Sequence, residues 1–189
     1  PFGAANNPRK RLAAAAGGCM LVRRAALEQV GAIAAIRHNI IDDVSLARVM
    51  KAQGPIWLGL TNRSVSLRPY EHLADIRAMV ARSAFAELDY SLLQLLGTLA
   101  GLVLVYLAPP LVALFGWNQS QLAGWLAWIL MALCFQPILR FYRLSPLWGL
   151  ALPLIAAFYA FFTLDSALQH WRGRGGMWKG RAQAPGAAP

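Results

Sequence analysis

The residues best suited to chemistry in this chain are two adjacent aspartates, Asp42 and Asp43. They stand where a helix is expected to begin, and that helix is expected to continue to Gln53. A carboxylate at a helix N-terminus is held in its ionised form by the free backbone N–H groups and the helix dipole. Such a carboxylate is a ready base or cation ligand, and it is equally a simple helix cap. The pair alone leaves both interpretations open.

A glycine pair, Gly17 and Gly18, precedes a short apolar run at 19–22. Glycine lets a ligand approach the backbone closely because it has no Cβ atom. The spacing matches neither a phosphate-binding loop nor a dinucleotide-binding fingerprint. The histidines and cysteines also lack metal-ligand spacing, since they are scattered at His38, His72, His170, Cys19 and Cys134. The sequence therefore predicts no metal site in this chain.

The elements that carry these residues favour an α/β fold for the proximal half. Apolar runs at 19–22 and 55–60 are expected strands, and 25–30 and 42–53 are expected helices ended by Gly31 and Gly54. A further helical stretch at 73–88 has its apolar residues on one face. That stretch either lies along a membrane surface or packs on a globular core.

The distal half contains three long runs without charge, at 92–115, 122–139 and 144–164. A helix rises about 1.5 Å per residue, so each run is long enough for a hydrocarbon core of roughly 30 Å. Three such runs favour membrane helices over buried core helices. Pro109 and Pro110 are expected to interrupt the first helix, and Pro153 is expected to bend the third.

Composition agrees with a membrane protein. The 189 residues are 58% apolar and 14% charged with a net charge of +10, whereas soluble domains are about 45–50% apolar and about 25% charged. So apolar a chain is not intrinsically disordered, and two cysteines do not make a disulfide scaffold. The basic residues flank apolar helices, which favours attraction to anionic membrane lipids over nucleic-acid binding.

The orientation of the helices stays open at this stage. Arg140 and Arg143 favour a cytoplasmic second loop, on the same side as the basic proximal half. Three full spans would then put the basic tail at 172–181 outside, against the usual bias. Either one run is re-entrant or interfacial, or the tail is an exception.

Several segments, taken in order, resemble a known family. They are Gly17-Gly18-Cys19-Met20-Leu21-Val22-Arg23-Arg24, Ile41-Asp42-Asp43, Ser66-Leu67-Arg68-Pro69-Tyr70 and Met79-Val80-Ala81-Arg82-Ser83-Ala84-Phe85. Together they resemble the family 2 glycosyltransferases of the GT-A fold, and most nearly the hopene-associated glycosyltransferases of bacterial hopanoid gene clusters. The Trp-Lys-Gly-Arg sequence at 178–181 is similar to the ending of lipid-directed members.

The resemblance implies roles for individual residues. Asp43 corresponds to the general base that deprotonates the acceptor hydroxyl, and Asp42 stands where the family usually has Glu. Gly17 and Gly18 belong to the acceptor-side segment. Arg82 corresponds to the arginine of a Gln-x-x-Arg-Trp motif that helps to hold the donor diphosphate, although the Gln and the Trp are missing here.

The resemblance also implies a function. The chain is expected to be the C-terminal part of a membrane-bound inverting glycosyltransferase that moves a sugar from a nucleotide sugar to a lipid, hopanoid or isoprenoid acceptor. The first residue is Pro1 rather than Met, and the half with the Asp-x-Asp motif and its Mg²⁺ or Mn²⁺ is expected to precede it. This fragment alone is expected to bind no cation and to be inactive. The expected location is the bacterial inner membrane, multi-pass, with the α/β part facing the cytoplasm.

This interpretation divides the chain into four parts. Residues 1–72 are the end of the GT-A domain, 73–90 a connecting helix, 91–165 three membrane helices, and 166–189 a basic tail with a disordered end. An alternative is a non-enzymatic membrane scaffold or lipid-handling remnant, in which Asp42 and Asp43 only cap a helix. A transporter subunit is disfavoured, because the uncharged runs offer no ion path.

Overall fold

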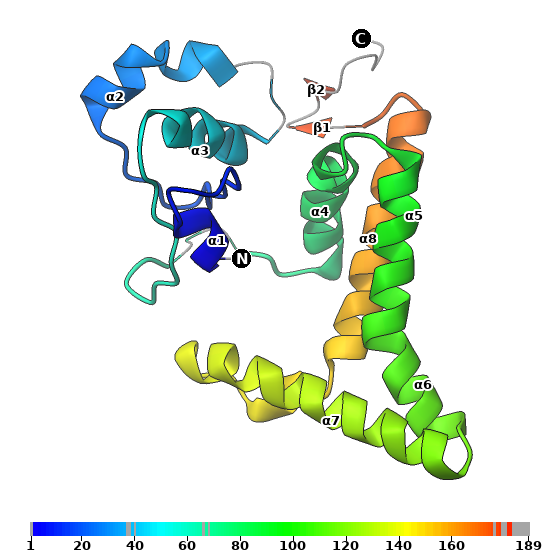
Figure 1. The fold of residues 1–189 in the computed structure, drawn as a ribbon. Coiled ribbons are helices and arrows are strands. Elements are labelled where there is room, and N and C mark those ends of the chain that lie inside the picture. Colours follow the sequence, from blue (N-terminus) through cyan, green and yellow to red (C-terminus); the bar gives the residue numbers. More distant parts are fainter. Residues whose placement is uncertain are drawn as a thin grey trace. The chain divides into compact units, whose positions relative to one another are not determined.

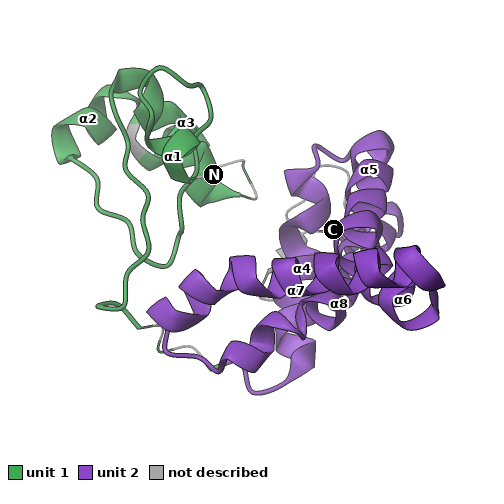
Figure 2. Ribbon diagram, turned by 60° about the horizontal axis from the view of Figure 1, so that its bottom comes forward, with its two compact units in different colours: residues 1–69 green, residues 70–189 purple. Residues whose placement is uncertain are grey.

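A computed structural model describes residues 2–36, 39, 41–65, 67, 69–175, 177–178 and 181–182. The chain divides into two compact units, Pro1–Pro69 and Tyr70–Pro189 (Figure 2).

The first unit is built from short helices. They are α1 (Phe2–Asn6), α2 (Arg24–Gln29), the 3-10 helix η1 (Ala32–Ile36) and α3 (Asp42–Gln53). Helix α3 ends at Gly54, as the sequence predicts. Its Lys51 ammonium donates hydrogen bonds to the carbonyl oxygens of Ala5 and Leu12, at 2.6 and 2.5 Å. The Lys51 side chain therefore connects the N-terminal segment to α3.

The prediction of an α/β, partial GT-A-type domain is wrong, because the described part of this unit has no strand. The runs at 19–22 and 55–60 are irregular, and Leu21 and Trp57 are largely exposed. The N–H and carbonyl of Leu58 bond to the side-chain amide of Asn6, at 2.6 and 2.9 Å. A strand needs a neighbouring strand to satisfy its backbone, and here a side chain satisfies it instead. These runs have β-like composition without a β partner.

The second unit contains the long helices. They are α4 (Leu73–Glu87), α5 (Leu92–Leu102), the π-helix η2 (Val103–Leu107), α6 (Ala108–Phe115), α7 (Asn118–Phe141), the 3-10 helix η3 (Pro146–Gly149) and α8 (Leu152–Trp171). Two-residue strands β1 (Met177–Trp178) and β2 (Arg181–Ala182) pair antiparallel. The segments Leu92–Phe115, Asn118–Phe141 and Leu152–Trp171 are long and apolar enough to cross a membrane. The prediction of three membrane-length helices is confirmed.

The prolines act at helix boundaries. The first long helix changes to π-type hydrogen bonding at Val103–Leu107, directly before Pro109 and Pro110, where an interruption is expected. Pro153 does not bend the third helix; it lies in the first turn of α8, where a missing N–H removes no helical bond. Helix α8 therefore begins eight residues after the start of the uncharged run and continues through Asp165.

Helices α4 and α5 both pack along α8 (Figure 1). Their meeting point is a cluster of Phe85, Leu95 and Ala167, whose exposed fractions are 1%, 1% and 0%. The Phe85 N–H donates to the buried Ser166 hydroxyl at 3.0 Å. Because Leu95 lies early in α5 and Ala167 late in α8, these two helices run antiparallel. Helix α7 instead crosses the opposite end of this pair in both views (Figures 1 and 2).

A glycine of α7 allows α6 and α7 to approach each other closely. A Cβ atom at Gly124 of α7 would lie 2.4 Å from the backbone nitrogen of Ala113 in α6. Gly97 and Gly101 form a G-x-x-x-G pattern, which is typical of membrane helices that pack closely. A Cβ atom at either glycine, however, would meet nothing within 4 Å. The α6–α7 hairpin is therefore tightly packed at Gly124.

We predict that Gly124→Ala destabilises the second unit and that Gly101→Ala does not. The added methyl at 124 meets backbone, which cannot rotate away, so overpacking should lower the free energy of unfolding by about 1–3 kcal/mol. Thermal unfolding of the detergent-solubilised chain measures both variants. Equal melting temperatures for the two variants would contradict the tight α6–α7 contact.

Candidate functional site

Asp43 and Gly17 are brought together by the fold of the first unit. The Gly17 N–H donates to the Asp43 Oδ2 atom at 2.8 Å, across 26 positions of sequence. The other carboxylate oxygen, Oδ1, accepts from the N–H of Val44 at 2.8 Å. Two backbone donors therefore fix the orientation of a half-buried carboxylate at the first turn of α3. The N-cap residue of α3 is Ile41, so Asp43 lies within the first helical turn, where the helix dipole favours a carboxylate.

The neighbouring candidates play lesser parts in this contact. Asp42 is exposed, and its Oδ1 accepts from the N–H of Asp43 at 2.9 Å. A Cβ atom at Gly18 would meet nothing within 4 Å, whereas one at Gly17 would lie 3.1 Å from Asp43 Oδ2. Of the two glycines, only Gly17 has a steric reason in this contact to lack a side chain.

Within the described ranges no group of three or more His, Cys, Asp or Glu side chains could hold a metal ion. The oxygens of Asp43 face N–H donors, which compete with a cation for the same lone pairs.

Arg82 lies in the second unit, on α4, where it lines an open cavity between α4 and α8. The cavity has a volume of about 280 Å³ and is lined by Ala74, Arg77, Ala78, Arg82 and Gln169. We call it the α4–α8 cavity. Two guanidinium groups and one amide are its polar lining.

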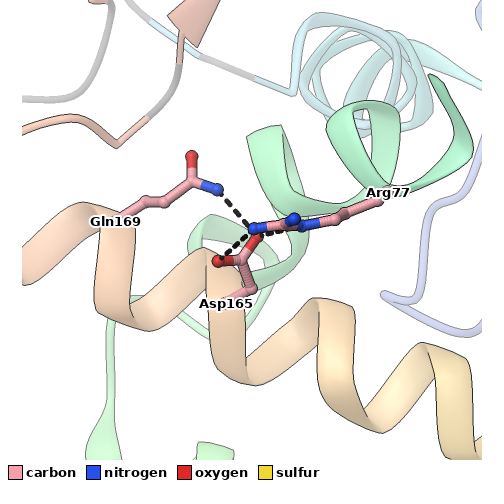
Figure 3. A network of polar contacts seen from close by, with 3 residues as sticks. All are labelled: Arg77, Asp165 and Gln169. Carbon is pink, nitrogen blue, oxygen red and sulfur yellow. Dashed lines mark hydrogen bonds and ion pairs between the residues drawn. The ribbon is translucent and has the colours of Figure 1, made fainter. Parts of the chain in front are cut away.

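An ion pair beside the cavity joins its two walls (Figure 3). Arg77 Nε and Nη2 donate to Asp165 Oδ2 and Oδ1, at 2.9 and 3.1 Å. Gln169 Nε2 donates to Oδ2 of the same carboxylate at 2.8 Å. The hydrogen bond and charge of Asp165 raise the pKa of Arg77 above its ordinary value. Asp165 thus keeps the Arg77 guanidinium oriented at the cavity edge.

The residue patterns did not predict a role for Arg77, Asp165 or Gln169. One signal for them is present: Asp165 is the single acid after residue 90, four positions before Gln169 on the same helix face. An acid in an apolar helix needs a partner, but its partner Arg77 is 88 positions away in sequence. Spacing along the chain does not reveal such a pair.

Comparisons with known proteins identify no family for the chain. No protein-family model matches it, and neither a curated protein nor a solved structure shows significant similarity.

We predict that Gly17→Ala loosens the first unit while Gly18→Ala leaves it intact. The new methyl at 17 displaces the Asp43 carboxylate from its N–H donor, and losing such a bond costs about 1 kcal/mol. Limited trypsin digestion of the full chain, followed by mass spectrometry of fragments from 1–69, measures the difference. Faster cleavage is expected for Gly17→Ala alone. Unchanged cleavage of that variant would show that the carboxylate contact contributes little.

Proposed function

We propose that this chain forms the acceptor-side and membrane part of an inverting glycosyltransferase. The enzyme transfers a sugar from a nucleotide sugar to a lipid acceptor, and this acceptor has a hopanoid or isoprenoid skeleton. The proposal keeps the activity implied by the sequence resemblance and not the α/β fold. One observation supports it most: two of the segments that carry the resemblance meet at the Gly17–Asp43 hydrogen bond.

In this proposal Asp43 is the general base. Its carboxylate takes the proton of an acceptor hydroxyl while the hydroxyl oxygen attacks the anomeric carbon of the sugar. The bond from that carbon to the nucleoside diphosphate breaks, and the diphosphate leaves with the electron pair. General-base catalysis of this kind contributes about 10²–10⁴ in rate. The fixed orientation of the carboxylate supports such a role, because a base must be held within reach of the proton it removes.

The nucleotide sugar and a divalent cation, Mg²⁺ or Mn²⁺, are assigned in this proposal to a segment outside residues 1–189. The described residues offer no group of ligands for a metal ion. A lipid acceptor is supported by the three membrane-length helices in the same chain.

We predict that Asp43→Asn abolishes sugar transfer in the full-length gene product. The amide keeps the size of the side chain and cannot accept the proton, so the rate should fall at least about 100-fold. Membrane vesicles containing the protein are incubated with a panel of radiolabelled nucleotide sugars, and label in the extracted lipid is counted.

A matched control is Asp75→Asn, which makes the same change in the first turn of another helix. Asp75 caps α4 by accepting from the His72 N–H at 3.2 Å, and Asn retains an acceptor there. Activity within about twofold of the parent is expected for this control. Full activity of the Asp43→Asn variant would show that Asp43 is not the general base. Label that never enters lipid from any donor would favour the non-enzymatic membrane scaffold.

We further propose a bacterial inner-membrane location with both ends of the membrane part in the cytoplasm. The antiparallel α5–α8 contact supports this orientation, since residues 92 and 171 then lie at the same end of the pair. The basic proximal half and the basic tail would both face the cytoplasm, as the positive-inside bias favours. Helix α7, which crosses the other end of the pair, would lie along the opposite surface.

We predict that Glu87→Cys and Arg172→Cys react from the same side of the membrane and Gln121→Cys from the other. All three positions are exposed in the structure. In a background with Cys19→Ser and Cys134→Ala, a membrane-impermeant maleimide should label only Gln121→Cys in intact spheroplasts. Inverted vesicles should show the converse pattern. Labelling of positions 87 and 172 from opposite sides of the membrane would instead require three membrane-crossing helices.

A further inference from the structure

A second cavity lies among the membrane-length helices of the second unit. It has a volume of about 390 Å³, which is within the range of small-molecule sites. The π-helix η2, the start of α6, the middle of α7 and the first residue of α8 form its wall. The lining residues are Val105, Tyr106, Pro109, Ala127, Met131, Cys134, Phe135 and Leu152, and none of these side chains is charged. We call it the η2–α7 cavity.

The Tyr106 hydroxyl is the polar side-chain group of this apolar lining. Tyr106 is half-buried and lies well inside the membrane-length segment Leu92–Phe115. In the described part of the chain, no residue donates a hydrogen bond to this hydroxyl or accepts one from it. A hydroxyl that leaves water without gaining a hydrogen bond is unfavourable. A ligand that brings a hydrogen-bond partner to Tyr106 would therefore be stabilised.

The backbone of η2 adds a hydrogen-bond acceptor at the neighbouring residue. The carbonyl of Val105 would accept from the N–H of residue 109 in an α-helix, and from that of residue 110 in a π-helix. Both positions are proline, which has no N–H. The N–H of Ala108 donates to the Val103 carbonyl instead. The Val105 carbonyl thus has no helical donor, and in hydrocarbon such a group needs another partner.

A donor and an acceptor on adjacent residues match one uncharged group, a hydroxyl. A hydroxyl can donate to a carbonyl and accept from a phenol at the same time. A charged headgroup does not match, because the lining offers no opposite charge to compensate for its loss of water. The other lining side chains are apolar and belong to helices that are long enough to lie in hydrocarbon. The cavity therefore fits a molecule with an apolar body and a hydroxyl group.

We propose that the η2–α7 cavity binds a lipid alcohol, meaning an uncharged membrane lipid with a free hydroxyl group. The ligand hydroxyl donates to the Val105 carbonyl and accepts from the Tyr106 hydroxyl. The apolar body of the ligand lies against Met131, Phe135 and Leu152. This binding does not depend on the proposed transferase activity, and it is measured without a sugar donor.

The test measures binding of hexadecanol to the full chain in detergent micelles, using native mass spectrometry. The matched probe is the methyl ether of hexadecanol, which can accept a hydrogen bond and cannot donate one. Hexadecanol should bind about fivefold more tightly than the ether, the factor expected for one net hydrogen bond. In a Cys19→Ser background, hexadecanol should also slow the alkylation of Cys134 by N-ethylmaleimide, because Cys134 lines the cavity.

Two variants test the two hydrogen bonds separately. Tyr106→Phe should weaken hexadecanol binding about fivefold. Tyr159→Phe removes the same hydroxyl from α8 outside the cavity and should bind hexadecanol like the parent. Pro109→Ala supplies an N–H donor to the Val105 carbonyl and should abolish the preference for the alcohol over the ether. This preference is a ratio within one variant, so a change in cavity shape affects both probes alike.

Three results would overturn the proposal. Equal binding of hexadecanol and its ether by the parent chain would show that no hydroxyl is recognised. Equal affinities of Tyr106→Phe and Tyr159→Phe for hexadecanol would show that the Tyr106 hydroxyl takes no part. Unchanged alkylation of Cys134 at saturating hexadecanol would show that the alcohol binds outside the cavity.

Discussion

The contact between α4 and α8 is the interaction on which the second unit depends. An amphipathic helix must cover its apolar face, and here it does so against a helix that is itself long enough to cross a membrane. Polar bonds at two levels set the register between them: Arg77 with Asp165, and the Phe85 N–H with the Ser166 hydroxyl. Hydrogen bonds are directional, whereas apolar packing alone tolerates sliding of one helix along the other. The register in turn determines which side chains line the cavity between the two helices.

The sequence predicts the long helices well because their signal is local. A run of apolar residues without charge has few stable structures other than a helix in lipid or in a core. The start of α8 was not predictable from that signal, since Ser145 accepts from the Leu147 N–H and the chain forms a 3-10 turn there before the helix begins. Apolar residues 144–151 thus belong to a connection despite their composition.

The proximal half shows where local patterns fail. A strand depends on a partner strand that lies elsewhere in the sequence. The composition of residues 55–60 therefore did not predict that the Asn6 side chain would bind their backbone instead. The approach of Gly17 to Asp43 and the pairing of Arg77 with Asp165 are likewise contacts between distant positions. The acidic pair was identifiable as a candidate from residue type alone. Its hydrogen-bond partners became visible only in three dimensions.

The π-helical turn at Val103–Leu107 gives the first long helix two different neighbours. Before the turn, α5 packs on α8; after it, α6 packs on α7. A π turn accommodates one more residue than an α turn, and this rotates the following helix by about 100° about its axis, the angle of one residue. The number of residues in this helix is consequently as constrained as their type. Over evolutionary time, a single-residue deletion here would turn the close-packed face at Ala113 away from Gly124. Many conservative substitutions at exposed lipid-facing positions, in contrast, would be tolerated.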